Sequence, residues 1–381
     1  MQVYLVGGAV RDTLLNQWHG VGAMRHDRDW LVVGSSPQAM QDAGFTPVGR
    51  DFPVFLHPQS HEEFALARTE RKVAAGYQGF TFHASPDVTL AQDLARRDLT
   101  INTLAVPLPA SYGLHPPAQW QWLESDVIDL HHGMNDLRQG VLRHVTEAFA
   151  EDPVRLLRLA RFAARWPHFT VAPATMVWLQ TMVQRGEVQA LVAERVWTEF
   201  AAALQARAPQ RALQVLHACG ALPQWLPGVL PDTPGLGRAV QREHPLAVRW
   251  ACLCHPLNEA DLQQLQSTLR VPRACADLAR LLQQHGHALA SWSSVSLEAL
   301  ASHLHACDPW RRPERFAQLL QAIGCSHAVP EATLQALTYA AQAMSDIPAE
   351  ALAKQGGNVA ERIAQARLDA LRQWRAVQSN T

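Results

Sequence analysis

The sequence has almost no lysine, little net charge and no long apolar run. Lysine occurs only at Lys72 and Lys354, so arginine supplies the other 31 of the 33 basic residues. A formal net charge of −1 excludes a uniformly basic nucleic-acid coat but leaves room for a local basic face. No apolar run approaches the roughly 20 residues of a membrane span, and no basic stretch with a cleavage site opens the chain. We therefore expect a soluble, cytoplasmic protein without a membrane partner.

Cysteine is absent from the first 200 residues. The six cysteines that follow form no CxxC pair and no zinc-finger spacing. This excludes a thioredoxin-like redox motif and a cysteine-bound structural zinc. The cysteines are typical of buried thiols in a reducing compartment.

Length and composition indicate an α+β fold of two or three domains. With 381 residues and 48% hydrophobic residues, the chain is too long for one ordinary core. The first part mixes strand signals, such as "QVYLVGG" and "DWLVVG", with helical spacing in "AVRDTLL", and "DVIDL" (126–130) is a further candidate strand. From about Leu142 onward strand signals vanish. We predict a head over residues 1–140, a helical neck over 141–225 and a helical body and tail over 226–381.

Two aspartates stand one residue apart in "RHDRDWLVVG" (25–34). On a strand, Asp27 and Asp29 face the same side, with Cα atoms roughly 6–7 Å apart. Such a pair can bind divalent metal and leave one side open for a substrate, as in two-metal displacement at phosphorus. Magnesium prefers a few carboxylates together with substrate phosphates. The pair therefore predicts a Mg²⁺ site, with a solvated strand start as the alternative.

Two neighbouring features favour chemistry on phosphates. Gly7 and Gly8, in "LVGGAVRD", follow a strand and precede a helix, so backbone can approach a ligand and helix N–H groups point at anions. Arg11, on the first helical turn, can reach a phosphate. The pattern is neither a Walker motif nor GxGxxG. Glu63, in "HEEFALARTER", is the predicted third carboxylate, with Glu62 as the alternative.

A dense polar set lies in "LARRDLTIN" (94–102), which has helical character. Arg97 can neutralise the charge of a triphosphate. Asp98 and Asn102 can hold a ribose or fix the arginine. A solvated helix face is the alternative interpretation.

The stretch "FAEDPVRLLRLARFAARW" (149–166) predicts a second functional helix. Asp152 followed by Pro153 is typical of a helix start. At about 100° per residue, the four arginines fall within one arc of about 120°, and apolar side chains occupy the opposite arc. These arginines are Arg155, Arg158, Arg161 and Arg165. We expect one side of the helix to pack and the other to show a row of arginines.

Taken together, "LVGGAVRD", "DRDW", "RRDLTIN" and "EDPVRLLRLARF" resemble the class II tRNA nucleotidyltransferases, the CCA-adding enzymes of bacteria. These belong to the polymerase-β-like nucleotidyltransferase superfamily, which also holds bacterial poly(A) polymerases. The resemblance covers roughly residues 1–225. It implies an enzyme that adds C, C and A to the tRNA 3′ end from CTP and ATP without a nucleic-acid template, with tRNA held through its acceptor arm.

The resemblance also implies roles for the candidate residues. Asp27 and Asp29 would hold Mg²⁺, and Glu63 would match the third carboxylate. The residues that would contact the nucleotide are Gly8, Arg11, Arg97, Asp98 and Asn102 with Arg158 and Arg161. The Gly- and Ala-rich stretch 71–80 would be a moving loop.

The resemblance also implies that the family's template motif E-D-x-x-R, matched here by Glu151, Asp152 and Arg155, chooses C and A. A carboxylate accepts a hydrogen bond from the exocyclic amine that both bases carry, and a guanidinium donates to C O2/N3 or A N1. U and G place a carbonyl oxygen against the carboxylate, which leaves buried polar groups unpaired.

The C-terminal part departs from relatives that carry an HD-type phosphohydrolase. His255 is followed by Pro256 rather than aspartate, and neither His285 nor His287 has an acidic partner at a convincing spacing. We expect a helical shell with no phosphohydrolase activity.

Three rival functions remain. A poly(A) polymerase of the same superfamily would use ATP alone, a non-catalytic RNA-binding relative would have lost the site, and a small-molecule nucleotidyltransferase would not need the arginine helix. The sequence favours no particular oligomeric state.

Overall fold

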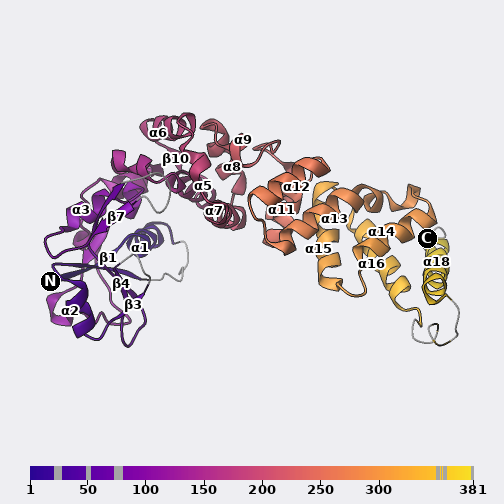
Figure 1. Ribbon diagram of the computed structural model, residues 1–381, viewed down its shortest axis with the longest axis horizontal. Helices are drawn as coiled ribbons and strands as arrows, with labels where there is room; N and C mark the ends of the chain where they lie inside the picture. The colour runs from indigo at the N-terminus through magenta and orange to yellow at the C-terminus, as the bar shows by residue number, and fades with distance from the viewer. Residues whose placement is uncertain are drawn as a thin grey trace. The chain divides into compact units, whose positions relative to one another are not determined.

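The computed structural model describes residues 1–20, 28–48, 53–72, 80–348 and 358–378, with Leu352 and Lys354. The chain divides into two compact units: Met1–Val192 with Ala218–Ala221, and Ala193–His217 with Leu222–Thr381. The described strands belong to the first unit, and the described part of the second is helical (Figure 1). The predicted α+β class is confirmed. The division into head, neck and body stays a prediction.

Six strands form the main sheet of the first unit, in the spatial order β3-β4-β5-β2-β1-β8. Their bounds are Gln2–Val6 (β1), Asp29–Val33 (β2), Thr46–Val48 (β3), Val54–Leu56 (β4), Glu63–Leu66 (β5) and Ala105–Pro107 (β8). Neighbours run antiparallel, except β2 and β5, which run parallel. Paired positions of two parallel strands face the same side, so β2 and β5 present their first side chains together.

After Asp29, the central strand β2 is apolar because both faces of the sheet are covered. Trp30 and Leu31 are at most 1% exposed. On one face Trp30 stacks on Phe64 of β5, with ring centroids 5.7 Å apart. On the other face Leu31 belongs to an apolar cluster with Leu94 of helix α3. The helix therefore covers the face onto which Asp29, two residues before Leu31, also projects.

The helices of the first unit begin and end at residues suited to those positions. Their bounds are Gly8–His19 (α1), Pro37–Asp42 (α2), Leu90–Ala95 (α3), Gly133–Gln139 (α4), Val154–Arg165 (α5) and Pro173–Gln184 (α6). Short 3-10 helices lie at Thr100–Asn102 (η2), Ala110–Tyr112 (η3), Glu124–Asp126 (η4), Glu147–Glu151 (η5) and Glu187–Ala190 (η6). Helix α1 follows Gly7, whose φ of 68° and ψ of −121° favour glycine. Helix α3 begins with a capping box formed by Thr89 and Gln92.

Two smaller strand pairs complete this unit. Strands β6 (Thr69–Lys72) and β7 (Phe80–His83) are antiparallel, and β9 (Val141–Leu142) and β10 (Thr170–Val171) are parallel. The last pair corrects the expectation that strands end near Leu142. Residues 73–79, within the predicted moving loop, lie outside the described residues.

The segment 126–130 is not a strand. It contributes only an isolated bridge between Ile128 and Ala105, because both of its aspartates serve turns. Asp126 accepts a hydrogen bond from the backbone N–H of Leu123, and Asp129 accepts from the backbone of Gly133 at the start of α4. Side chains that bond to nearby backbone in this way compete with strand pairing.

Two helix predictions also need correction. Helix α3 ends at Ala95, so Arg97 and Asp98 lie beyond it; Asp98 accepts a hydrogen bond from the backbone N–H of Leu99, which ends helical geometry. Helix α5 is present as predicted, but its row of arginines is not uniformly displayed. Arg155 is 9% exposed, and every other residue of α5 is buried or half-buried.

The second unit packs helices against helices. Their bounds are Ala193–Gln205 (α7), Pro209–Ala218 (α8, whose last residue belongs to the first unit), Leu222–Trp225 (α9), Pro234–Gln241 (α10), Leu246–Cys254 (α11), Glu259–Thr268 (α12), Arg273–Ala290 (α13), Leu297–Cys307 (α14), Pro313–Ser326 (α15), Glu331–Ser345 (α16) and Val359–Gln378 (α18), with a 3-10 turn at Trp292–Ser294. Helix α11 is buried from Ala247 to Cys254 and packs against α13 and α15. All six cysteines of the chain are buried free thiols, as predicted.

Across the described ranges, no helix combines the length and the apolar character needed to cross a bilayer.

Three histidines lie close together around His255, the position at which relatives with an HD-type phosphohydrolase carry a His-Asp pair. Nε2 of His255, after α11, lies 3.2 Å from Nε2 of His327, after α15, and the His287 ring lies 6.0 Å from the His327 ring between centroids. Burial and the charges of His255 and His287 lower the pKa of His327 to about 4. His255 therefore contacts another histidine. The absence of phosphohydrolase activity stays a prediction.

We predict that acidification weakens this unit through His327. An unfolded histidine takes up a proton near pH 6.5, whereas folded His327 stays neutral until about pH 4, so the stability it contributes is lost as the pH falls from about 6.5 towards 4. His327→Gln should reduce this loss, measured by hydrogen exchange of the α11 and α15 amides at pH 7 and pH 5. His217→Gln, an exposed control in the same unit, should behave as wild type. Identical pH profiles for wild type and His327→Gln would contradict the prediction.

Candidate functional site

Two carboxylates stand side by side where β2 and β5 begin. Asp29 is the register partner of Glu63, and both are exposed. Their strands are neighbours, so the two backbones lie about 4.8 Å apart. Carboxylate oxygens at this spacing suit a hard divalent cation. Asp27, the other half of the predicted pair, lies outside the described residues.

The alternative carboxylate, Glu62, points to the opposite face. It pairs with the Arg28 guanidinium and accepts a hydrogen bond of 3.3 Å from Trp30 Nε1. Since Trp30 and Asp29 are adjacent on a strand, their side chains lie on opposite faces of the sheet. Of the two glutamates, Glu63 is therefore the one that shares a face with Asp29.

The glycine turn lies beside this pair of carboxylates. Val6 is the register partner of Asp29, and Gly7 and Gly8 follow it directly. A Cβ placed on Gly7 would lie 3.1 Å from Arg97 Nη1. The absence of a side chain at Gly7 thus lets Arg97 approach the turn from which α1 begins.

Arg11 is deeply buried, with 4% of its surface exposed. Its Nε donates to Asp12 at 2.8 Å, its Nη1 donates to the side-chain oxygen of Asn102, and its guanidinium lies 4.8 Å from the ring centroid of Trp166. Burial lowers the pKa of Arg11, and the Asp12 carboxylate opposes that effect. The side chain is therefore held by Asp12, Asn102 and Trp166, and its predicted contact with a phosphate stays a prediction.

Asp12 joins α1 to α5. The carboxylate is 5% exposed and accepts a second hydrogen bond, of 2.7 Å, from Arg165 Nη2. Burial alone would raise the pKa of Asp12, but Arg11 and Arg165 hold it below its usual value. One buried charge is thus balanced by two arginines from separate segments.

Asp98 makes the second connection to α5. It accepts hydrogen bonds from Asn102 Nδ2 at 2.9 Å and from Arg158 Nε at 2.7 Å. Burial would raise the pKa of Asp98, but the Arg158 charge and these hydrogen bonds hold it well below its usual range. Asn102 therefore stands between Arg11 and Asp98 and links the two carboxylate clusters.

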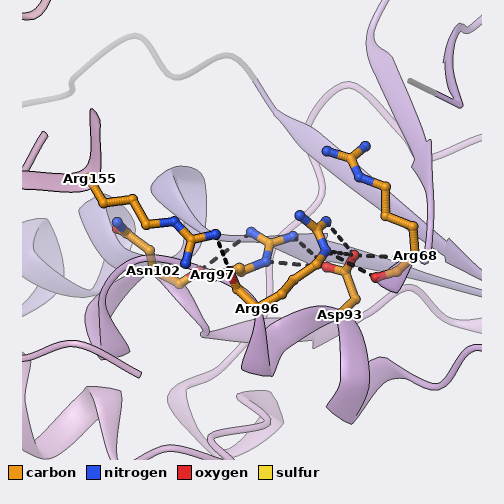
Figure 2. Close-up of polar contacts among 6 residues, drawn as sticks. All are labelled: Arg68, Asp93, Arg96, Arg97, Asn102 and Arg155. Atoms are coloured by element: carbon orange, nitrogen blue, oxygen red, sulfur yellow. Dashed lines mark hydrogen bonds and ion pairs between the residues drawn. The ribbon is translucent and has the colours of Figure 1, made fainter. Parts of the chain in front are cut away.

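Asp93 is the third buried acid and is fully covered. Figure 2 shows its carboxylate between Arg96 and Arg97, with the backbone of Arg68 beside it. Arg97 also donates from Nη1 to the Asn102 carbonyl at 3.4 Å. Arg97, which lies against the glycine turn, is thus anchored to α3.

The E-D-x-x-R residues lie at the start of α5. Asp152 Oδ1 accepts from the backbone N–H of Val154, the first residue of α5, at 3.1 Å. Arg155 donates from Nη1 to the Ala148 carbonyl at 2.9 Å. Its Nη2 donates to the Arg96 carbonyl at 2.7 Å (Figure 2). Arg161 lies over the ring of Phe162. Arg155 is thus bound to backbone rather than displayed on a free face.

The structure brings most of the predicted residues together in one unit. Asp29, Glu63, Gly8 and Arg97 are connected through β1 and the glycine turn, and a second group is connected through ion pairs and hydrogen bonds. That second group comprises Arg11, Asp98, Asn102, Arg155 and Arg158. Sequence reasoning missed the roles of Asp12 and Asp93. A helical spacing of three and four residues from Asp93 to Arg96 and Arg97 was the available signal for Asp93.

Comparison with known proteins defines the class of this site. Residues 3–143 match the family described as "Poly A polymerase head domain", and residues 168–232 match "Probable RNA and SrmB- binding site of polymerase A". The chain therefore carries the head of a nucleotide-polymerising enzyme.

Two curated relatives match nearly the whole chain. A "Multifunctional CCA protein" of Verminephrobacter eiseniae is 44% identical, over 99% of this chain and 100% of its own length. A "CCA-adding enzyme" of Bordetella pertussis is 47% identical, over 97% of this chain and 96% of its own length. The chain belongs to the family of CCA-adding enzymes.

The fold agrees with this assignment. A solved Thermotoga maritima CCA-adding enzyme, complexed with tRNA, superposes with a TM-score of 0.62 at 19% identity, covering 99% of this chain and 91% of that one. The predicted family resemblance is confirmed.

We predict that Gly7 tolerates no side chain. Gly7→Ala would place a Cβ 3.1 Å from Arg97 and impose a backbone conformation that costs about 1–3 kcal/mol of the free energy of unfolding. Gly8→Ala is the matched control, because its Cβ would meet only Arg11, at 3.5 Å, within a helix. Hydrogen exchange of the β1 and α1 amides in a urea series should show a loss for Gly7→Ala only. Equal stability of the two variants would contradict this account.

Proposed function

We propose that this chain is a CCA tRNA nucleotidyltransferase that adds C, C and A to the tRNA 3′ end from CTP and ATP, without a nucleic-acid template, and releases pyrophosphate. The names of the full-length relatives support this activity. One structural observation carries it furthest. The exposed pair Asp29 and Glu63 lies at the glycine turn, and Arg97 reaches the same turn.

The metal in this proposal is Mg²⁺. Nucleotidyltransferases of this kind generally use divalent metal ions. Carboxylate oxygens are the ligands that Mg²⁺ prefers. Asp27 and Asp29 are the pair expected from the sequence pattern to hold it, and Glu63, beside Asp29, is the third carboxylate. Bound Mg²⁺ would favour ionisation of the tRNA 3′-hydroxyl and offset charge on the α-phosphate.

The remaining residues bind and orient the nucleotide. The N–H groups at the start of α1, beginning with Gly8, point along the helix axis towards an anion. Arg97 is held at this turn, and Arg158 and Arg161 are half-buried on α5, so the three can place positive charge on the triphosphate. Fixed positive groups stabilise the departing pyrophosphate without reorganising during the reaction.

Arg11, Asp98 and Asn102 form a buried network that holds residues of this site in place. All three are buried. Asn102 accepts from Arg11 and donates to Asp98, and Asp98 accepts from Arg158, so this network sets the position of the Arg158 guanidinium. A buried carboxylate that holds an arginine in place keeps the guanidinium aligned before the substrate arrives.

Base choice is assigned to Asp152 and Arg155. A guanidinium has five N–H donors, so the two backbone acceptors of Arg155 are compatible with a further bond to a base. C and A present an amine to a carboxylate and an acceptor to a guanidinium, whereas U and G leave the pair unsatisfied.

The carboxylate assignment predicts that Asp29→Ala and Glu63→Gln each lower CCA addition by at least about 100-fold, because ligands of the metal are lost. Binding of tRNA should persist, as measured by filter binding. Glu62→Gln, which alters the opposite face, should retain activity within a few-fold. An inactive Glu62→Gln with an active Glu63→Gln would reverse the assignment.

The base-choice assignment predicts that Arg155→Ala raises the ratio of UTP to CTP incorporation by about 10-fold or more, since the donor that distinguishes them is removed. Arg185→Ala is the matched control, because Arg185 is exposed in the same unit and lies outside the site. Unchanged rejection of UTP by Arg155→Ala would exclude the role.

The same assay separates the rival functions. A tRNA that ends at the discriminator base is incubated with each NTP singly and with CTP and ATP together. Addition of ATP in long runs without CTP would indicate the poly(A) polymerase suggested by the name of the head family. Binding without addition would indicate a non-catalytic RNA-binding relative.

A further inference from the structure

The carboxylate of Asp93 binds the side chains of two arginines, Arg96 and Arg97, and the backbone of a third, Arg68. The exposed fraction of Asp93 is 0%, and the residue lies in α3 with its carboxylate directed at the two residues that follow the helix. Oδ1 accepts from Arg96 Nε at 3.0 Å and from the backbone N–H of Arg68 at 3.3 Å. Oδ2 accepts from Arg97 Nη2 at 3.2 Å and Nε at 3.3 Å. Figure 2 shows this arrangement.

The contact with Arg97 fixes the direction of that side chain. Asp93 holds Nε and Nη2, so the remaining nitrogen, Nη1, projects towards the Asn102 carbonyl and the Gly7 position. A carboxylate that grips one edge of a planar guanidinium determines where the other edge points. Without this grip, several rotatable bonds would be free to move Arg97 away from the glycine turn.

The contact with Arg96 reaches two other parts of the site. Arg96 Nε also donates to the Arg68 carbonyl at 3.0 Å, which ties α3 to the residues that follow β5, the strand that begins at Glu63. The Arg96 carbonyl accepts from Arg155 Nη2 at 2.7 Å. A displacement of the backbone at Arg96 would therefore move an acceptor of Arg155.

The charges of Arg96 and Arg97 require a carboxylate at the position of Asp93. Burial would raise its pKa, but the charges of Arg97 and Arg96 hold the pKa of Asp93 below its usual value. The side chains of Arg96 and Arg97 are 16% and 20% exposed, so each is largely shielded from water. Removal of the carboxylate charge would leave two neighbouring cations without their common partner, and they would separate.

We propose that Asp93 is a positioning residue that orients Arg97 towards the triphosphate and, through the Arg96 carbonyl, sets Arg155 for base choice. This inference rests on the proposed function. It assigns one buried carboxylate to two separate steps, nucleotide binding and nucleotide selection.

The test is Asp93→Asn, which keeps the volume and removes the charge. We expect the KM for CTP and ATP to rise about 10-fold or more, kcat at saturating nucleotide to change far less, and UTP incorporation relative to CTP to rise. A misplacement of about 1 Å is enough for effects of this size. Unchanged KM and unchanged selection would overturn the inference. Should Asp93→Asn fail to fold, Asp93→Glu keeps the charge but moves it by one methylene, and a wild-type KM for that variant would overturn it equally.

A double-mutant cycle shows whether Asp93 acts through Arg97. Arg97→Met alone should raise KM, and adding Asp93→Asn should raise it little further, because the group being positioned is already gone. Multiplicative effects of the two substitutions on KM would overturn the inference.

Asp136→Asn supplies the matched control for lost stability. Asp136 is 2% exposed, pairs with Arg143 at 3.0 Å and accepts from Thr100 at 2.7 Å, so the substitution also removes a buried charge that faces an arginine. It should leave the KM for CTP and the UTP-to-CTP ratio near wild type. Equal effects of Asp136→Asn and Asp93→Asn would assign the change to general destabilisation and overturn the inference. Wild-type protein that adds no nucleotides to tRNA would instead overturn the proposed function.

Discussion

Buried carboxylates shared between arginines are the constraint on which the first unit depends. Asp12, Asp93 and Asp98 are at most 6% exposed. Asp12 and Asp93 each pair with two arginines, and Asp98 pairs with Arg158. A buried acid without its partner costs about 3–5 kcal/mol, whereas the intact pair adds little over an apolar replacement. These contacts therefore specify one arrangement of α1, the α3–η2 segment and α5 more than they raise stability.

This arrangement suits work on a triphosphate. Arginine presents a planar group with five donors, so it can hold a buried carboxylate with one edge and offer another edge to a phosphate or a base. Lysine, a compact point charge, could not serve two acceptors in fixed directions in the same way. In the proposed function, the carboxylates of the network keep the arginines aligned while Asp29 and Glu63, exposed on β2 and β5, hold the metal.

Elements whose signals were local could be predicted from the sequence. Strand β2, the glycine turn, α1 and α5 all lie where periodicity, Gly7 and the Asp152–Pro153 pair indicated. The failures have a common cause. Asp98, Asp126 and Asp129 bond to nearby backbone, which ends α3 at Ala95 and leaves 126–130 with a single bridge. An aspartate can face solvent, bond to the backbone of a turn or sit in a paired strand. Which of these it does depends on the local backbone geometry, which the periodicity of the sequence does not specify.

By itself the sequence determined the fold class, the family and the identity of the chemical groups, because these follow from residue types at short spacings. Tertiary structure alone decided which groups face one another. The parallel register of β2 and β5 placed Glu63, not Glu62, on the face of Asp29. Packing of α5 buried Arg155 against the Arg96 carbonyl and left Arg158, Arg161 and Arg165 half-buried. Contacts between residues some 60 to 150 positions apart carry no signal in the local sequence, since their energy exists only once the segments meet.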